Sequence, residues 1–211
     1  LAQSRAVSNA QEAATAAAAI GFPVALKIRS AAIVHKTEAG GVMLDLADER
    51  QVIDAADALL KSARAAHPDA KIDGLLVQQM VSGVEAIVGV HTDPLYGPLL
   101  LVGSGGIMVE LMRDVAQRLL PVGAGEIGKM IDGLKLARVL AGYRGRPAAD
   151  RVALEGSALA LSRFYLDHRA RVAEIEVNPL IVRGNGAVAV DVRVVWHREN
   201  PREENSREEK M

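Results

Sequence analysis

The stretch that most limits how this chain can fold runs from Pro23 to Leu46, PVALKIRSAAIVHKTEAGGVMLDL. Two short apolar runs, PVALKI and VMLDL, lie on either side of a polar segment that contains a glycine pair. Runs of this length that are rich in apolar residues and bounded by glycine, proline and polar residues are typical of half-buried strands. The stretch therefore predicts a strand at 23–28, a loop, and a second strand at 42–46.

Several groups in this strand-loop-strand segment suit an anionic ligand. Lys27 can bury its stem against the first strand while its ammonium faces the ligand. His35 and Lys36 add an imidazole and a second cation in the loop. Gly40 and Gly41 have no Cβ, so the backbone can approach a ligand closely and present its N–H groups. Phosphate binding is one interpretation of this pattern, and an ordinary hairpin with solvated lysines is the other.

Composition argues against several classes of partner and chemistry. The 25 basic and 26 acidic side chains give a formal net charge of -1, so no overall field attracts nucleic acid or an anionic membrane. An aromatic content of 3 % also counts against base-stacking surfaces. The absence of cysteine excludes disulfides, thiolate metal sites and a cysteine nucleophile, and it fits a cytoplasmic location. No apolar run reaches the roughly 18 residues that span a bilayer.

The order of helix and strand patterns predicts an α+β protein of two lobes. Helices are expected at 49–66 and at 150–168, and a further helix should run from the capping box at Ser8 to Gly21. Two short helical patterns lie between 125 and 142. Further strands are expected over 74–81, 84–90, 99–102, 117–122, 172–177, 180–182 and 187–194. We expect lobes at 1–81 and 82–197, followed by a disordered charged tail at 198–211.

A group of oxygen-bearing side chains near the end of the chain suggests a metal site. Strand alternation places Glu174, Glu176 and Asn178 on one face, and a hairpin can bring Asp191 alongside them. Carboxylate and amide oxygens suit Mg²⁺, which takes phosphates of a nucleotide as further ligands. The alternative is a charged strand face paired with arginines. Because uncompensated acids on facing strands repel each other, we favour the metal site.

The motifs GFPVALKI, IVHKTEAGGVMLDL, GVEAIVGVHTDPLYGP, VGSGGIMVEL, LAGYRGRP and EIEVNPLIV with AVDVRV extend over nearly the whole chain. Together they resemble the ATP-grasp domain of NDP-forming acyl-CoA synthetases. That family includes ADP-forming acetyl-CoA synthetase and, more distantly, the β subunit of succinyl-CoA synthetase. The resemblance implies an ATP-grasp fold, in which two α+β lobes hold ATP or ADP between them. It also implies the reaction acyl-CoA + ADP + phosphate ⇌ carboxylic acid + CoA + ATP, relayed through a phosphohistidine.

The resemblance also implies roles for individual residues. The implied nucleotide-binding positions are Lys27, Gly40, Gly41, Val77, Gln78, Met80, Val81, Glu85, Gly105 and Gly106. Lys27 would contact the phosphates, the hinge at 77–81 would read the adenine edge through its backbone, and Glu85 would hold the ribose. Gly105 and Gly106 match the loop near which the phosphohistidine segment docks.

The catalytic and metal positions follow from the same resemblance. His35 matches a histidine that receives the phosphoryl group near the nucleotide, and Lys36 belongs to the loop that covers the phosphates. Asn178 and Asp191 match the magnesium positions, with Glu176 beside them.

The family's CoA-binding domain is absent from these 211 residues. The resemblance therefore implies a ligase that needs a CoA-binding partner carrying a phosphohistidine, most simply as a hetero-oligomer. Because the chain starts at Leu1, inside the region that opens the domain in the family, we expect the first lobe to lack part of its N-terminus. The alternatives are a nucleotide-binding regulatory domain of a protein acetyltransferase and a stand-alone carboxylate-amine ligase. The chemistry of such a ligase has no need of His35.

Overall fold

The computed structural model describes residues 1–33, 40–106 and 113–197. The chain divides into two compact units, Leu1–Val81 and Ser82–Met211. His35, Lys36 and the charged tail lie outside the described residues, so the expectations for them stay predictions.

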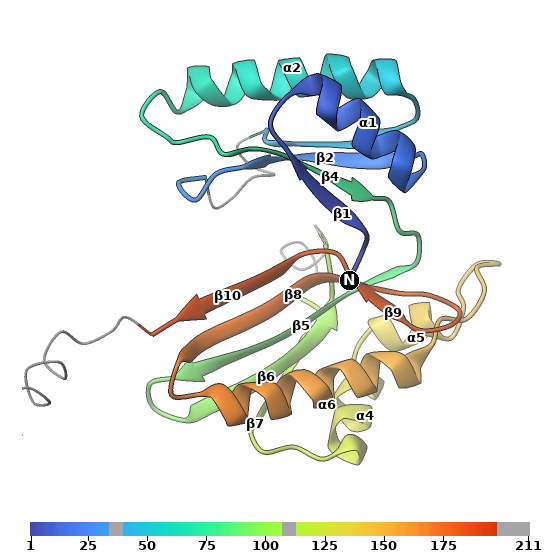
Figure 1. The fold of residues 1–211 in the computed structure, drawn as a ribbon. Coiled ribbons are helices and arrows are strands. Elements are labelled where there is room, and N and C mark those ends of the chain that lie inside the picture. The colour runs from blue at the N-terminus through green and yellow to red at the C-terminus, as the bar shows by residue number, and fades with distance from the viewer. Residues whose placement is uncertain (34–39, 107–112, 198–211) are drawn as a thin grey trace, which may run out of the picture. The chain divides into compact units, whose positions relative to one another are not determined.

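The first unit is a four-stranded antiparallel sheet with helices on one face (Figure 1). Its strands, in sheet order, are β1 (Ser4–Val7), β4 (Gly74–Gln79), β2 (Val24–Arg29) and β3 (Val42–Leu46). The helices are α1 (Ala10–Ile20) and α2 (Glu49–Ala66). Alternate residues of β2, namely Val24, Leu26 and Ile28, pack with both helices in one apolar core. The intervening positions, including Lys27, therefore face the opposite side of the sheet.

Helix α1 begins one residue later than its sequence pattern predicts. The cap is Asn9, whose side chain accepts the N–H of Glu12 at 2.9 Å. The Glu12 carboxylate in turn accepts the N–H of Ser8 at 2.8 Å. An ionised glutamate three residues after the cap is a stronger capping partner than Gln11, which explains the shift. Gly21 ends the helix as expected, with φ at 95° and its N–H donating to the Ala17 carbonyl.

The second unit is a six-stranded sheet, again with helices on one face (Figure 1). Strand order is β10 (Val192–Trp196), β8 (Val172–Val182), β5 (Val84–Asp93), β6 (Gly97–Ser104) and β7 (Val115–Leu119), and β9 (Ala187–Ala189) also pairs with β8. The helices are α4 (Ala124–Asp132), α5 (Leu136–Leu140) and α6 (Arg151–His168). Their apolar sides share a core with alternate residues of β5, β6 and β8. Sheet residues that point away from this core lie on what we call the open face of the second sheet.

Strand β8 carries a bulge at Asn178 and Pro179, which are joined by a cis peptide bond. The flanking pairs with β5 are Val177 with Val88 and Leu180 with Ala86. Two residues of β8 therefore stand opposite the single residue Ile87 of β5. The core residues of β8 are Val172, Ile175, Val177, Leu180 and Val182. From Ile175 on, the bulge lets the core side change from odd to even numbering, and it takes Asn178 out of the ladder with β5.

The structure differs from the sequence expectations mainly where strands are joined or divided. Strand β8 is continuous where two strands are expected, because the bulge keeps pairing on both sides of Asn178. One expected strand at 187–194 is divided into β9 and β10. Strand β1 is not expected at all, since SRAV is short and three of its four residues are exposed at the sheet edge. On α6, Ser162 is buried together with Leu154, Ala158 and Tyr165, and Leu161 packs partly buried against the same core. No helix in the described part of the chain is long and apolar enough to cross a membrane.

Candidate functional site

Lys27 is a buried cation near the centre of the first sheet. It lies opposite Leu76 on β4 and Val42 on β3, and its residue is 9 % exposed. Because Leu26 and Ile28 face the helices, Lys27 lies on the other face of the sheet. Placing an ammonium at low exposure costs free energy unless charged or polar groups compensate it. Such a position is where a cation that serves a ligand is expected.

The glycine pair lies at the start of β3. Gly40 has φ at 64°, a left-handed conformation that glycine adopts without strain. Gly41 is buried, and its carbonyl accepts the N–H of Ile28 at 2.8 Å, so it continues the pairing of β2 with β3. The pair thus joins the sheet directly to the preceding segment that carries His35 and Lys36, both outside the described residues.

The segment expected to read a base changes character along its length. Val77 and Gln78 lie inside β4, between β1 and β2, so their backbone groups belong to the sheet ladders. The N–H of Gln79 donates to the Gln3 carbonyl at 2.8 Å, and the N–H of Met80 makes a longer bond of 3.4 Å to the Pro23 carbonyl. The residues of this segment that lie beyond the sheet ladder, and whose backbone groups could contact a base, are therefore those at 80–81.

In the second unit, the glycine pair after β6 meets the start of β5 and the bulge of β8. The N–H of Gly105 donates to the Glu85 carbonyl at 2.9 Å, and the N–H of Gly106 donates to Asn178 Oδ1 at 2.9 Å. Gly106 has φ at 63°, and a Cβ there would overlap the Glu85 carboxylate. A Cβ on Gly105 would overlap the backbone of Ala86. Gly105 requires glycine because its neighbour is backbone, and the left-handed φ of Gly106 favours glycine. Together the two residues bring Glu85 and Asn178 close to each other.

Asp191, in the segment between β9 and β10, lies next to Asn178 at the bulge of β8. Its carbonyl accepts the N–H of Asn178 at 3.1 Å, and the N–H of Val190 donates to the Pro179 carbonyl at 3.1 Å. Asp191 is exposed and Asn178 is half-buried. The structure thus brings Asn178 and Asp191 side by side, as the sequence analysis expects.

Glu176 lies on the same face as Asp191, on the core-distal side of β8. Burial is the largest cause of its raised pKa; the Glu174 carboxylate raises this pKa further, Arg193 lowers it and Asp191 raises it. Arg193 lies opposite Glu176 and pairs with Glu174 at 3.1 Å. The arginine pairing that competes with a metal site is therefore present at Glu174, and Arg193 also lowers the pKa of Glu176.

A hollow of about 380 Å³ opens beside Glu176 on the open face of the second sheet. Its walls include Glu174, Glu176, His91, Leu101 and Val195, and its floor contains Gly89, which has no side chain to fill the space. The sequence pattern presents His91 only as a residue that precedes a turn. Its position opposite Glu174 depends on the pairing of β5 with β8, which sequence spacing does not reveal.

The donor atoms at the bulge fit Mg²⁺. In the described ranges, no three histidine, cysteine, aspartate or glutamate side chains come close enough to form a metal site by themselves. The candidate set instead combines the amide oxygen of Asn178 with the carboxylates of Asp191 and Glu176. Mg²⁺ commonly takes one or two carboxylates from a protein and completes its shell with water and phosphate oxygens.

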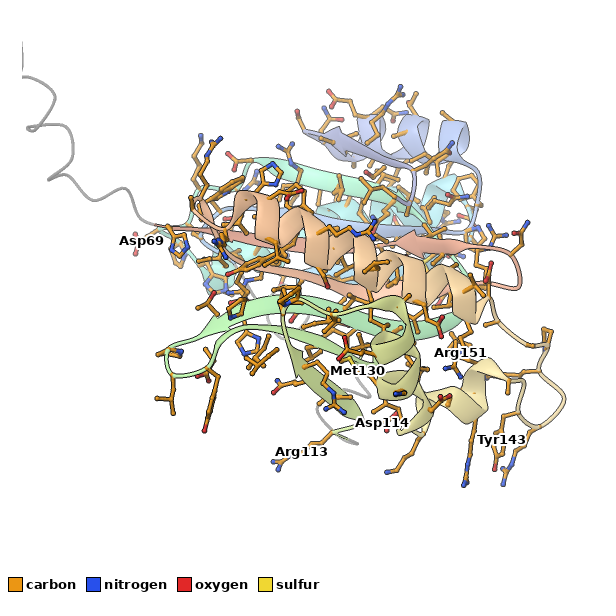
Figure 2. The ribbon with its side chains drawn as sticks, turned by 90° about the horizontal axis from the view of Figure 1, so that it is seen from below. Asp69, Arg113, Asp114, Met130, Tyr143 and Arg151 are labelled. Atoms are coloured by element: carbon orange, nitrogen blue, oxygen red, sulfur yellow. The ribbon has the colours of Figure 1, made fainter. Side chains whose placement is uncertain are left out.

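Asp114 and the hydroxyl of Ser104, which lie next to the glycine pair, have no role in the sequence analysis. Asp114, labelled in Figure 2, is 7 % exposed and lies just before β7. Its carboxylate accepts the Ser104 hydroxyl at 2.7 Å and the N–H groups of Lys135 and Leu136 at 2.8 and 2.9 Å. The neighbouring Arg113 is exposed. No local pattern identifies Asp114, because its partners lie 10, 21 and 22 residues away in the sequence.

The ATP-grasp domain family matches residues 1–195 of the chain. The chain belongs to this family, and the sequence resemblance is thereby confirmed. It is 37 % identical over 187 residues to the β subunit of ADP-forming acetate–CoA ligase II of Pyrococcus furiosus, covering 87 % of this chain and 79 % of that subunit. The chain spans only 28 % and 27 % of the length of two longer curated relatives, to which it is 38 % and 39 % identical.

Solved structures agree with this assignment. Acetyl-coenzyme A synthetase 1 of Ca. Korarchaeum cryptofilum, in complex with coenzyme A and Ca-AMPCP, matches with a TM-score of 0.86 and 34 % identity, covering 93 % of this chain and 86 % of that one. The same synthetase with coenzyme A and Mg-AMPPCP, its phosphohistidine segment pointing towards the nucleotide binding site, matches with a TM-score of 0.76 and 31 % identity, covering 93 % and 85 %. The ATP-grasp fold expected from the sequence is confirmed.

Proposed function

We propose that this chain is the nucleotide-binding ATP-grasp subunit or domain of an ADP-forming acyl-CoA synthetase. Its part in the reaction is to move a phosphoryl group between ADP or ATP and a phosphohistidine. The observation that carries the proposal is the meeting of Glu85, Gly106, Asn178 and Asp191 at the bulge of β8. In the second unit these residues supply oxygen ligands for a cation, and beside them Gly106, which has no Cβ, leaves room for a ligand to come close to the backbone.

The first unit supplies positive charge and base recognition. Lys27 holds its ammonium at a fixed place in the sheet, where it can neutralise phosphate oxygens without a large loss of side-chain freedom on binding. The backbone of Met80 and Val81 reads the base edge, since these residues lie beyond the last β4 residue that pairs with β2 and the Met80 N–H makes only a long bond of 3.4 Å. Gly40 and Gly41 let the backbone approach the phosphates from the segment just before β3.

The second unit supplies the ribose and cation ligands. The Glu85 carboxylate, which lies against Gly106, accepts ribose hydroxyls. Asn178, Asp191 and Glu176 would hold Mg²⁺, which when bound neutralises charge on the transferring phosphoryl oxygens. The N–H of Gly106 fixes the orientation of the Asn178 amide before any cation arrives.

His35 and Lys36 are proposed to complete the reaction from the segment before Gly40. An imidazole can accept a phosphoryl group as a nucleophile, and a nearby ammonium stabilises the charge that develops on the transferring oxygens. These two assignments depend on the sequence motif IVHKTEAGG alone, because both residues lie outside the described ranges.

A CoA-binding partner is the remaining requirement of the proposed reaction. The Pyrococcus furiosus relative is a β subunit, and the chain spans about a quarter of the longer relatives. Both observations support a hetero-oligomer, or a longer polypeptide, in which another part binds CoA and carries the phosphohistidine.

The test is a calorimetric titration of ADP and ATP, with Mg²⁺, into the full chain and into Lys27→Ala. We expect micromolar binding by the wild type and a loss of at least tenfold, or about 1.4 kcal/mol, in Lys27→Ala. The matched control is Lys71→Ala, which removes an exposed lysine of the same unit that pairs with Asp73 at 3.3 Å. Its affinity should stay within about twofold of wild type. A folded wild type that binds neither nucleotide, or equal losses in both variants, would contradict the proposal.

A further inference from the structure

A chain of hydrogen bonds connects a buried carboxylate to the proposed metal-binding amide in the second unit. It starts at Asp114, whose carboxylate accepts the Ser104 hydroxyl and whose carbonyl accepts the Ser104 N–H at 2.9 Å. Gly105 and Gly106 follow Ser104 directly and donate to the Glu85 carbonyl and to Asn178 Oδ1. Every link in this chain is a contact of 2.7 to 2.9 Å or a covalent neighbour.

The carboxylate end of this chain is held rigidly. Asp114 accepts the N–H groups of Lys135 and Leu136 at the start of α5, in addition to the Ser104 hydroxyl. Burial alone would raise the pKa of Asp114, but the three hydrogen bonds together lower it, so the group stays ionised at neutral pH. A charged acceptor with three donors forms stronger bonds than neutral pairs do.

The backbone around the carboxylate is packed too closely for a looser arrangement. A Cβ on Gly103 would overlap the Asp114 carbonyl and lie 2.9 Å from the Val115 Cα. The end of β6 therefore lies directly against Asp114, and a shift of one moves the other. The position of Gly105 and Gly106, which follow Ser104 directly, is therefore fixed by the same contact.

We infer that Asp114 and Ser104 form a positioning clamp that holds the Gly105–Gly106 backbone in place, so that the Gly106 N–H orients the Asn178 amide for the cation of the bound nucleotide. Neither residue contacts the proposed ligand; both act through Gly106. The cation part of this inference depends on the function proposed above, and the Gly106 part does not.

The first test measures hydrogen exchange at the Gly106 amide by NMR in the full chain. In Asp114→Asn an NH₂ group, which can only donate, replaces one carboxylate oxygen. The remaining oxygen has two lone pairs and cannot accept all three donors. We expect exchange at Gly106 to become about tenfold faster, because its hydrogen bond opens more often. Ser104→Ala removes only the hydroxyl and leaves α5 anchored to Asp114, so it remains informative if Asp114→Asn fails to fold; we expect an increase of about threefold.

The matched control is Asp93→Asn at the other end of the same two strands. Asp93 also accepts two loop N–H groups, those of Leu95 and Tyr96 at 2.8 and 2.9 Å, and it lies opposite Gly97 at the start of β6. Its loss should leave Gly106 exchange within about twofold of wild type. If Gly106 exchange is the same in wild type, Ser104→Ala and folded Asp114→Asn, the clamp does not exist.

The second test separates positioning from general destabilisation. ADP affinity is measured with Mg²⁺ and with EDTA for each variant. We expect Asp114→Asn to lose about tenfold with Mg²⁺ and clearly less in EDTA, since the Asn178 ligand acts only when the cation is bound, whereas Glu85, which also lies against Gly106, acts in both conditions. Equal losses under both conditions would overturn the positioning role. A wild type that binds ADP equally well with and without Mg²⁺ would overturn the proposed metal site, and Gly106 exchange would then decide the clamp alone.

Discussion

The two sheets carry proposed ligand-binding groups of opposite charge, and they differ in how deeply these groups are buried. Each is covered by helices on one face, and each carries proposed ligand-binding groups away from its core (Figure 1). The first sheet presents a cation, Lys27, that is almost completely buried. The second presents oxygen ligands, among which Asp191 is exposed and Asn178 half-buried. A lysine stem is apolar and can be buried up to its ammonium, whereas a carboxylate carries its charge on a short stem and needs water, a cation or, as at Asp114, several hydrogen-bond donors around it.

The difference extends to the backbone that holds these groups. Lys27 lies on a strand whose pairing with β4 is regular from Val24 to Arg29, and the register shift against β3 lies between Val24 and Leu26, before Lys27. The oxygen site depends on two departures from regular pairing, the bulge at Asn178 and the glycine pair that packs against Glu85 and Ala86. A regular strand is enough to place one charge, while convergence of several oxygens at one point requires the strands to deviate.

The largest effect should come from Gly105→Ala, which tests whether the second site tolerates any relaxation of its backbone. A Cβ there would overlap the Ala86 carbonyl and lie 2.8 Å from the Ala86 nitrogen. Since backbone cannot move aside as a side-chain end can, we expect a loss of about 3 kcal/mol in the free energy of unfolding. Urea denaturation of the full chain measures this.

The control for this substitution is Gly156→Ala in the middle of α6, where an added Cβ meets no atom within 4 Å. We expect it to stabilise the protein by up to about 1 kcal/mol, because alanine favours the helix. Equal small effects of the two substitutions would show that the close approach at Gly105 is not a constraint.

A smaller effect is expected when Asp191→Asn removes one carboxylate from the oxygen site. Affinity for ADP should fall about tenfold with Mg²⁺, corresponding to about 1.4 kcal/mol, and should change little in EDTA. The reason is that the amide has no charge with which to bind the cation. Calorimetry under both conditions separates this from Lys27→Ala, which should weaken binding in both. If the two variants lose affinity in the same pattern, the division of charge between the sheets is wrong.

The smallest effect concerns the turn that leads into β9 and on to Asp191. Asp150 caps α6 through the Ala153 N–H at 3.0 Å and accepts the Gly186 N–H at 2.8 Å. The Gly186 bond is the largest cause of a lowered pKa at Asp150, followed by that from Ala153. A lowered folded pKa means that the stabilisation is fully present above the unfolded value of about 3.8 and is lost as the pH falls through the lower folded value.

We therefore expect wild type to melt a few degrees above Asp150→Asn at neutral pH, and the difference to shrink as the pH falls below about 4. Thermal melts between pH 7 and pH 3 measure it. Asp57→Asn, an exposed position on α2, serves as the control. A difference between wild type and Asp150→Asn that widens in acid would show that the sign of this linkage is wrong.

The regular parts of the fold are the parts that the sequence predicts. The limits of α2 at 49–66 and of β3 at 42–46 agree with expectation, because an apolar stripe and glycine or polar boundaries mark them clearly. Strand β1 escapes prediction, since it is only four residues long, two of them polar, and its place depends on pairing with β4, about 70 residues later in the chain. The one-residue shift of the α1 cap shows that two overlapping capping patterns cannot be ranked by spacing alone.

The same distinction holds for the site. The shared face of Glu174 and Glu176, and the approach of Asp191 to Asn178, follow from alternation and one hairpin, both of which sequence spacing contains. The hydrogen bond from Gly106 to Asn178 and the contacts of Asp114 join residues that are far apart in the chain. Only tertiary pairing creates them, so no local pattern could have indicated them. The binding roles assigned to these residues stay predictions until the titrations are done.

The bulge in β8 also has a consequence for how the site could be gained or lost. Against β5, Asn178 and Pro179 face a single residue, but along the other edge they face two, Val190 and Asp191. Pairing is regular on both sides, with Val177 opposite Val192 and Leu180 opposite Ala189. Removing one residue from each of these two segments would therefore give an uninterrupted sheet that keeps every core residue on its present side. Two of the three proposed cation ligands, Asn178 and Asp191, thus lie in a paired insertion, while Glu176 lies on the regularly paired part of β8.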